Sequence, residues 1–358
     1  MRSSRPRTSW WPKTEVLTRR RLLGAAVAAL VAPRAARAQS RVVVDSAGRR
    51  VEVPATIRRV FAAGGPASVF VYTLVPDTLL GWTRELTAEE RAWLPMKYAD
   101  LPAFGRLTGR GNTANVEVVL AARPDIVLDF GTVGPTYVSL ADRVQEQTKI
   151  PYVLLDGSLS ATPRAYTIAG DLLGIPERGG ELARYVDRTL SDVDRRVASV
   201  PRDRRPSVYY ARGPKGLETA APGSINSESL DRLGARNVAE GSGRGLTTVS
   251  LEQVLAWNPE VILTLDPAFH AGVARDPSWR GVRAVKNGRV HLVPQAPFPW
   301  VDSPPSVNRV IGLCWLGHVL YPDAFPGSVR DEARTFYGLF YHRVPDDRQL
   351  DSLLGSKS

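Results

Sequence analysis

Cysteine, methionine and histidine are scarce in this chain. Its 358 residues include one cysteine, two methionines and four histidines. A lone thiol has no partner for a disulfide, and because Cys314 lies in an apolar helical pattern we expect it in the core. The histidines lack the His-x-His and His-Glu-x-x-His spacings of zinc sites, which argues against binding of a bare metal ion. They are His270, His291, His318 and His342.

A transmembrane segment and a strongly basic surface are also missing. The apolar run at 22–32 is shorter than the roughly 20 residues that a transmembrane helix needs. Residues 1–38 hold nine Lys/Arg and one Glu, so they carry +8 of the net +11 and leave +3 for the rest. The rest therefore lacks the charge of a nucleic-acid-binding protein.

Motifs of common enzymes are absent as well. The sequence has no Gly-x-Ser-x-Gly, and its Gly-rich turns at 109–111 and 213–216 match neither a Walker motif nor a dinucleotide fingerprint. We therefore expect neither catalysis nor a cofactor.

Residues 1–38 have the pattern of an export signal. Residues 18–24, Thr-Arg-Arg-Arg-Leu-Leu-Gly, form a twin-arginine type segment, and Ala36-Arg37-Ala38 is a small-residue cleavage site. An uncleaved membrane anchor is the alternative. We expect a soluble protein of the periplasm that begins near Gln39.

One pattern occurs twice, at 115–128 and at 250–263. Glu117 and Glu252 coincide at an offset of 135 residues, as do several apolar positions and a proline. Each copy predicts a capped short helix with an acid in its first turn, then a buried parallel strand. Two copies about one domain length apart predict two similar α/β lobes.

The remaining periodicity places these lobes along the chain. Strands are predicted at 42–44, 51–53, 58–62, 79–82, 152–156, 207–210, 261–265 and 290–293. The predicted organisation is an export signal at 1–38, an N-terminal α/β lobe at 41–160, a helical linker at 161–200, a C-terminal α/β lobe at 205–325, and a C-terminal helix and tail at 326–358.

The two Glu-bearing repeats, the helical link and the export signal resemble the class III periplasmic substrate-binding proteins of ABC importers. That family serves iron–siderophores, haem, vitamin B12 and related metal complexes. The resemblance covers essentially the whole mature chain. It implies two Rossmann-like lobes joined by a long helix, with ligand in the cleft between them. It also implies a monomer whose partners are an ABC permease dimer and its ATPase.

The resemblance gives the two repeat glutamates a role. In the family, the acids at these positions dock into arginine pockets on the two permease subunits, which here would be the role of Glu117 and Glu252. Helix capping alone is the alternative, since an acid in a first helical turn stabilises a helix by ~0.3–1 kcal/mol.

The ligand cleft is expected outside the carboxyl ends of the strands, where the loops supply arginines beside glycines, aromatic rings and serines near helix starts. These suit an anion that carries oxygen acceptors. The candidate ligand-binding residues are Ser68, Arg110, Tyr137, Tyr210, Arg212, Ser224 and Trp300. His270 is the one histidine expected near the cleft. Solvated loop arginines and a core tryptophan are the alternatives.

The resemblance favours a ferric siderophore or another iron chelate, and the same loops suit the oxyanions molybdate and tungstate. The sequence leaves both open. An exported ligand sensor or a cofactor enzyme is the alternative from other classes.

Overall fold

A three-stranded parallel sheet forms the centre of the N-terminal half of the computed structural model, which describes residues 40–109, 111, 113–241 and 245–355. Its strand order is β3-β4-β5, at Val60–Ala62, Ile126–Gly131 and Tyr152–Asp156. The antiparallel hairpin β1 (Ser40–Val44) and β2 (Arg50–Pro54) precedes it. The helices are α1 (Gly65–Leu74), η1 (Pro76–Thr78), α2 (Ala88–Ala92), α3 (Met96–Ala99), α4 (Val116–Ala122) and α5 (Pro135–Thr148).

The C-terminal half contains a second parallel sheet, ordered β11-β10-β6-β8. These strands are Val290–Leu292, Val261–Thr264, Ser207–Ala211 and Arg236–Asn237. β7 (Glu218–Ala220) and β9 (Leu246–Thr248) pair antiparallel and form a separate two-stranded sheet. The helices of this half are α8 (Glu228–Arg232), α9 (Leu251–Trp257), α10 (Pro267–Val273) and α11 (Arg283–Lys286).

Two long helices connect the sheets, α6 (Thr162–Leu173) and α7 (Pro176–Ala198). Gly174 ends α6 at φ 73°, and Pro176 starts α7, as expected for a left-handed glycine cap followed by a proline in the first turn. The helices approach closely because both contribute glycine: a Cβ on Gly170 would lie 2.9 Å from the Cα of Gly179. The 3-10 turn η2 (Arg202–Arg204) follows α7.

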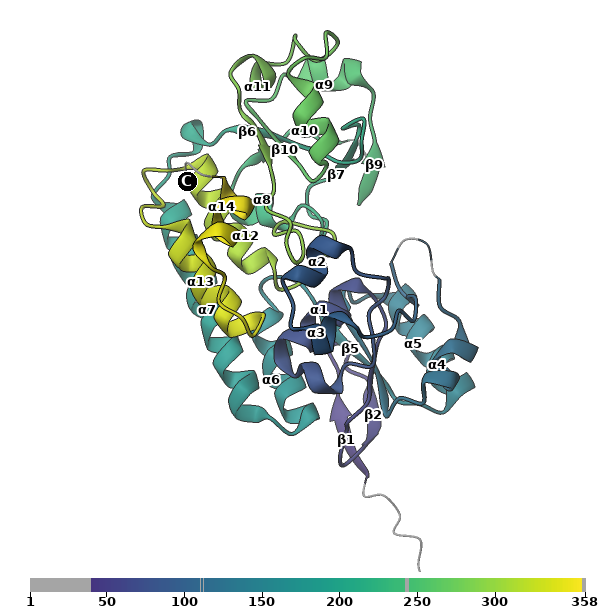
Figure 1. Cartoon of the computed structure of the whole chain (residues 1–358). Helices are drawn as coiled ribbons and strands as arrows, with labels where there is room; N and C mark the ends of the chain where they lie inside the picture. The colour runs from purple at the N-terminus through teal and green to yellow at the C-terminus, as the bar shows by residue number, and fades with distance from the viewer. Residues whose placement is uncertain (1–39, 110, 112, 242–244, 356–358) are drawn as a thin grey trace, which may run out of the picture. The chain divides into compact units, whose positions relative to one another are not determined.

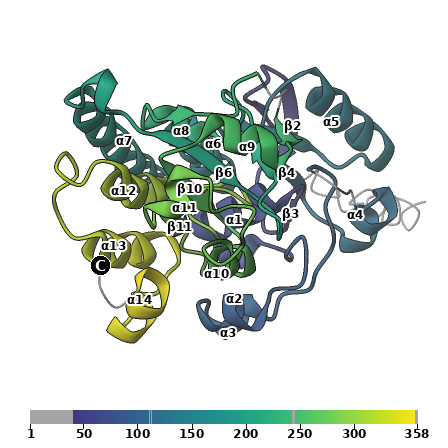
Figure 2. The same cartoon turned by 90° about the horizontal axis from the view of Figure 1, so that it is seen from above.

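Three further helices end the chain: α12 (Arg309–Leu320), α13 (Val329–Phe340) and α14 (Asp347–Leu354). Figures 1 and 2 show α12 and α13 lying beside α7. The sequence predicts only one helix after 327, which is wrong. Asp346 caps α14 by accepting from Gln349 N, while the Gln349 side chain accepts from Asp346 N.

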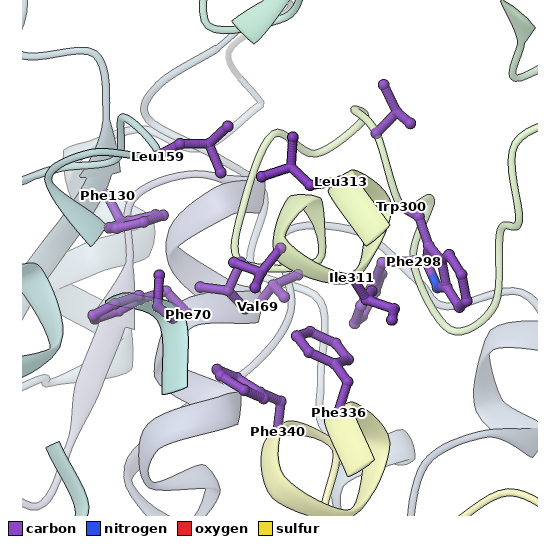
Figure 3. Packing of buried hydrophobic residues seen from close by; sticks show 14 of the residues in the cluster. Val69, Phe70, Phe130, Leu159, Phe298, Trp300, Ile311, Leu313, Phe336 and Phe340 are labelled. Carbon is purple, nitrogen blue, oxygen red and sulfur yellow. The ribbon is translucent and has the colours of Figure 1, made fainter. Parts of the chain in front are cut away.

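The largest hydrophobic cluster joins both sheets to the connecting and C-terminal helices (Figure 3). Phe70 of α1 stacks on Phe130 of β4 at 4.3 Å between ring centroids, and Phe336 stacks on Phe340 within α13 at 4.4 Å. Tyr72 donates a hydrogen bond from its hydroxyl to the carbonyl of Tyr341, 269 residues away. Two smaller clusters fill the space under α4 and α5 and under α9 to α11.

The repeat is confirmed as a helix–strand unit in each half. Asn115 caps α4 and Ser250 caps α9, each accepting a backbone hydrogen bond with its side chain. Both helices end at a left-handed residue, Arg123 at φ 47° and Asn258 at φ 45°. In each copy a proline comes next, followed by the strand, β4 or β10. The fold class predicted from the sequence, two parallel α/β units joined by a helical link, is confirmed.

One predicted strand is wrong. Residues 79–82 form only two isolated bridges, Val60 with Leu79 and Trp82 with Ala103. Gly81 lies against residues 102–104, where a Cβ would come within 2.3 Å of the Pro102 carbonyl oxygen. On this side Trp82 N donates to the Pro102 carbonyl (2.9 Å), and on the other side Leu80 N donates to the Val60 carbonyl (3.1 Å). Each side is paired through a single bridge, so no regular strand forms. Within the described residues, no helix is both long and apolar enough to cross a membrane.

Candidate ligand pocket

A pocket of about 770 Å³ lies where the two halves meet at the carboxyl ends of their strands. Its wall includes the segments that follow β3, β4 and β6, which is where open α/β sheets bind ligands. The chain contributes the start of α1, residues of the loop at 82–86, residues 106–109 and Thr113, the start of α5, Arg212 and residues 302–305.

Two helices begin at the pocket without a side-chain cap. The cap residue of α1 is Gly64 and that of α5 is Gly134, and each helix has a proline in its first turn. Gly64 is required there, because a Cβ would lie 2.5 Å from Thr108 Oγ1. Uncapped starts leave backbone N–H groups and the positive end of the helix dipole for an anion.

Three arginines among the described residues line the pocket. Arg84 is an exposed residue that pairs with Glu90. Arg212 pairs with Asp302 and Glu218. Arg106 is half-buried, and within the described chain its guanidinium donates to the Gly111 carbonyl (3.1 Å) and forms no ion pair. Arg106 is therefore the arginine whose charge is available to a ligand.

Arg212 belongs to a buried network. Asp302, which is 0% exposed, accepts hydrogen bonds from Arg212 Nη1, Asn226 Nδ2 (2.8 Å) and the Tyr210 hydroxyl (3.2 Å). Burial raises the pKa of Asp302, and the guanidinium opposes that rise. The Arg212 guanidinium also lies over the Tyr210 ring, 5.6 Å from its centroid. The network fixes Arg212 at the pocket wall and neutralises its charge.

A second buried carboxylate, Asp129, lines the pocket from β4. Its two oxygens accept hydrogen bonds from Thr108 Oγ1 and from the Tyr152 hydroxyl, each at 3.2 Å. Burial raises the pKa of Asp129 to about 6, which these hydrogen bonds reduce only in part. Burial raises the pKa of the half-buried Tyr137, and the charge of the nearby Asp129 raises it further.

The structure brings three of the candidate residues to the pocket wall: Ser68, Tyr137 and Arg212. Ser68 is buried, and its hydroxyl donates to the Gly65 carbonyl (2.9 Å). Arg110 lies outside the described residues.

The other candidates lie behind the wall or away from it. Trp300 is 0% exposed and donates from Nε1 to the Tyr337 hydroxyl (3.0 Å), so it is a core residue. Tyr210 contacts the Arg212 guanidinium with its ring and does not line the pocket itself. Ser224 does not line the pocket either, and its hydroxyl donates to the Ser227 hydroxyl (3.3 Å). His270 contacts the Val290 carbonyl (3.2 Å) and is not part of the wall.

Sequence reasoning overlooked most polar residues of the wall, among them Arg84, Arg106, Thr108 and Asp129. One signal was available, since Asp129 is a single acid in the apolar run of β4. Thr108 and Arg106 lie in the Gly-rich loop whose chemistry was assigned to Arg110 alone. No group of three or more His, Cys, Asp or Glu side chains in the described chain could hold a metal ion.

The repeat glutamates are not part of the pocket wall. Glu117 on α4 and Glu252 on α9 are both exposed. A backbone N–H lowers the pKa of Glu252 most, and the Ser250 hydroxyl lowers it further. The Glu252 carboxylate is therefore ionised at neutral pH.

Comparison with known proteins places the chain in one family. A model described as "Periplasmic binding protein" matches residues 79–297. The molybdate-binding protein MolA of Haemophilus influenzae is 25% identical over 326 residues, 84% of this chain and 91% of that protein. A vitamin B12-binding protein of Vibrio cholerae is 25% identical over 214 residues, 56% of this chain and 71% of its own length.

A solved structure agrees over nearly the full length of both chains. An ABC transporter solute-binding protein from Sulfurospirillum deleyianum superimposes with a TM-score of 0.81 at 30% identity, covering 88% of this chain and 99% of that one. The chain belongs to the periplasmic binding protein family, the substrate-binding components of ABC transporters.

Proposed function

We propose that the protein captures a tetrahedral oxyanion of the molybdate and tungstate class in this pocket and delivers it to an ABC permease. One observation carries the proposal: α1 and α5 both begin at the pocket, and neither start has a side-chain cap. Two such starts supply backbone donors and positive dipole ends to an oxyanion. Arg106 adds a cation that no described acid neutralises.

One of the relatives supports the same ligand class. MolA of Haemophilus influenzae is named for molybdate binding and matches this chain over 84% of its length. Small hydroxyl donors are also abundant in the wall, including Thr83, Thr132 and Thr136. Hydroxyl and backbone donors suit the four equivalent oxygens of a tetrahedral anion.

An anionic iron chelate, such as a ferric siderophore, is the second candidate, and the pocket volume favours it. About 770 Å³ falls within the usual range of small-molecule sites and exceeds the need of one tetrahedral anion. Trp82, Tyr137 and Phe298 add aromatic surface to the wall. Such surface suits an organic chelate better than a bare oxyanion.

Delivery requires a partner, and we propose that the permease binds the two repeat helices. Glu117 and Glu252 are exposed carboxylates at equivalent positions of α4 and α9. A twofold-related pair of permease subunits with basic pockets would pair with one glutamate each, and charge complementarity of this kind sets orientation and association rate.

The ligand is tested by measuring binding and composition together. Protein purified from its own periplasm is weighed by native mass spectrometry and assayed for molybdenum, tungsten, iron and cobalt. Calorimetric titration then compares molybdate, tungstate, a ferric catecholate complex and cobalamin. Molybdenum or tungsten in the purified protein, with submillimolar binding of the matching anion, supports the proposal. Iron or cobalt with no oxyanion binding rejects it in favour of the chelate.

The docking proposal is tested separately from the ligand. The double variant Glu117→Arg/Glu252→Arg should lose uptake in cells while its ligand affinity stays that of the wild type, because neither residue lines the pocket. Unchanged uptake would contradict docking through these residues and favour a ligand sensor. Arg58→Glu, a charge reversal at another exposed site, is the matched control.

A further inference from the structure

Asp129 is an acid at the wall of a pocket built for an anion. It is the fourth residue of β4, whose neighbours in the strand are apolar, and it is 5% exposed. Thr108 Oγ1 and the Tyr152 hydroxyl each donate to one of its oxygens at 3.2 Å. The backbone N–H of Phe130 is a third donor to the carboxylate. An ionised carboxylate has about four acceptor positions, so about one remains for a ligand.

The elements around Asp129 bring no cation to it within the described chain. β5 contributes Tyr152, α5 contributes Tyr137, and the loop contributes Thr108. The sequences of β3 and α1 contain no charged residue. Arg49, the cation whose charge acts on Tyr152, pairs with Asp45 and Asp142.

A buried carboxylate without a cation opposes the entry of an anion when it is ionised. When it carries a proton, the same group becomes a hydrogen-bond donor to a ligand oxygen. Burial raises the pKa of Asp129 to about 6, so both forms are accessible near neutral pH. The ionisation state of this one side chain therefore changes which ligands the pocket accepts.

We propose that Asp129 is a specificity-determining residue that holds the ligand through one shared proton. An oxyanion without a proton of its own is captured with one proton taken up from solvent onto Asp129. A ligand that carries its own hydroxyl or N–H donor is captured with Asp129 ionised and accepting. The inference rests on the proposed function, because it assumes that the pocket wall described above contacts an anion.

The experiment measures molybdate affinity against pH in the wild type and in Asp129→Asn. For the wild type, the dissociation constant should rise about tenfold per pH unit above about pH 6 and level off below it. The Asn amide keeps a donor but does not titrate. Its dissociation constant should be independent of pH and, at about pH 8, at least tenfold lower than that of the wild type.

A second readout counts the proton directly. Calorimetric titrations at about pH 7.5 in two buffers of different ionisation enthalpy should give uptake of about one proton per molybdate for the wild type and none for Asp129→Asn. Thr108→Val removes one donor to the ionised carboxylate, so the pH at which affinity begins to fall should move upward while the slope stays the same. Thermal melting confirms that each variant is folded.

The outcomes separate this inference from the proposed function. Equal pH slopes in the wild type and Asp129→Asn, or no proton uptake by the wild type, overturn the role of Asp129. If molybdate and tungstate bind at no pH, the oxyanion proposal fails, and the same pH series is run with a ferric catecholate complex. If the dissociation constant of that complex rises with pH in the wild type but not in Asp129→Asn, the inference is supported. If it is independent of pH in the wild type, the inference is overturned.

Discussion

Leu120 and Leu255 occupy the same position in the two copies of the repeat, and both side chains are exposed, at 46% and 37%. Each leucine lies three residues after a repeat glutamate, so the acid and the apolar side chain share one helix face. The proposed docking surface therefore has one exposed leucine beside each glutamate.

The first prediction concerns this leucine pair. Leu120→Ser/Leu255→Ser should reduce uptake in cells severalfold, because burial of a leucine against a partner contributes about 1.5–3 kcal/mol at most. Ligand affinity and melting temperature should stay at their wild-type values. Val44→Ser, at a side chain 54% exposed on β1, is the control and should leave uptake intact. Equal uptake by both variants would exclude the leucines from the docking surface.

The second prediction concerns Arg106. Arg106→Ala should weaken molybdate binding at least tenfold, about 1.4 kcal/mol, because it removes the pocket cation that has no described acidic partner. The melting temperature should change little, since the guanidinium bonds only to a loop carbonyl. Calorimetric titration measures the affinity, and Arg58→Ala controls for the loss of one positive charge elsewhere. An unchanged affinity would remove Arg106 from the site.

The third prediction separates stability from binding at Arg212. Arg212→Ala should destabilise the fold by about 3 kcal/mol or more, because the fully buried Asp302 loses its cation. Arg84→Ala breaks a pair whose arginine is 53% exposed, and should cost about 1 kcal/mol or less. Urea unfolding measures both. Adding Asp302→Asn to Arg212→Ala should recover part of the loss, and a failure to recover would contradict the pairing.

The fourth prediction is a pH dependence of stability. The folded protein raises the pKa of Asp129 from 3.8 to about 6, so the folded state keeps a proton that the unfolded state releases. This contribution is greatest below about pH 4 and is lost as pH rises to about 6, a change of about 3 kcal/mol. In Asp129→Asn it should vanish. Urea unfolding at several pH values measures the free energy of unfolding of the wild type and of Asp129→Asn. A difference between the two free energies that stays constant with pH would contradict the prediction.

The fifth prediction concerns export. Arg19→Lys/Arg20→Lys should abolish the periplasmic fraction of the protein, because twin-arginine export requires the arginine pair. Cell fractionation with immunodetection measures this, and Arg5→Lys is the control. A periplasmic fraction equal to that of the wild type would point to another export route.

Local signals were sufficient to predict most of the fold. The caps of the two repeat helices, at Asn115 and Ser250, and most of the apolar strands depend on neighbours within a few residues, and the structure has them where predicted. Residues 79–82 do not form the predicted strand, because they pair with Val60 and with Ala103 through single bridges only. The extent of such pairing depends on segments outside the local sequence.

The candidate site was less predictable, because its chemistry depends on distant partners. Trp300 is in the core since α13 supplies Tyr337 as its hydrogen-bond acceptor. Arg212 looks like a free loop cation in the sequence, yet Asp302 neutralises it across 90 residues of chain. Asp129 reads as a polar end to a strand, and only the approach of Thr108 and Tyr152 makes it a buried, titratable group.

The hydroxyl of Tyr72 on α1 reaches the carbonyl of Tyr341, and Phe336 and Phe340 complete the same core. The early half of the polypeptide therefore cannot reach its final packing while it emerges from the ribosome, since α13 is synthesised near the end. Maturation must wait for the last helices, so a translocation machinery that accepts only folded cargo would act on this protein after synthesis is finished.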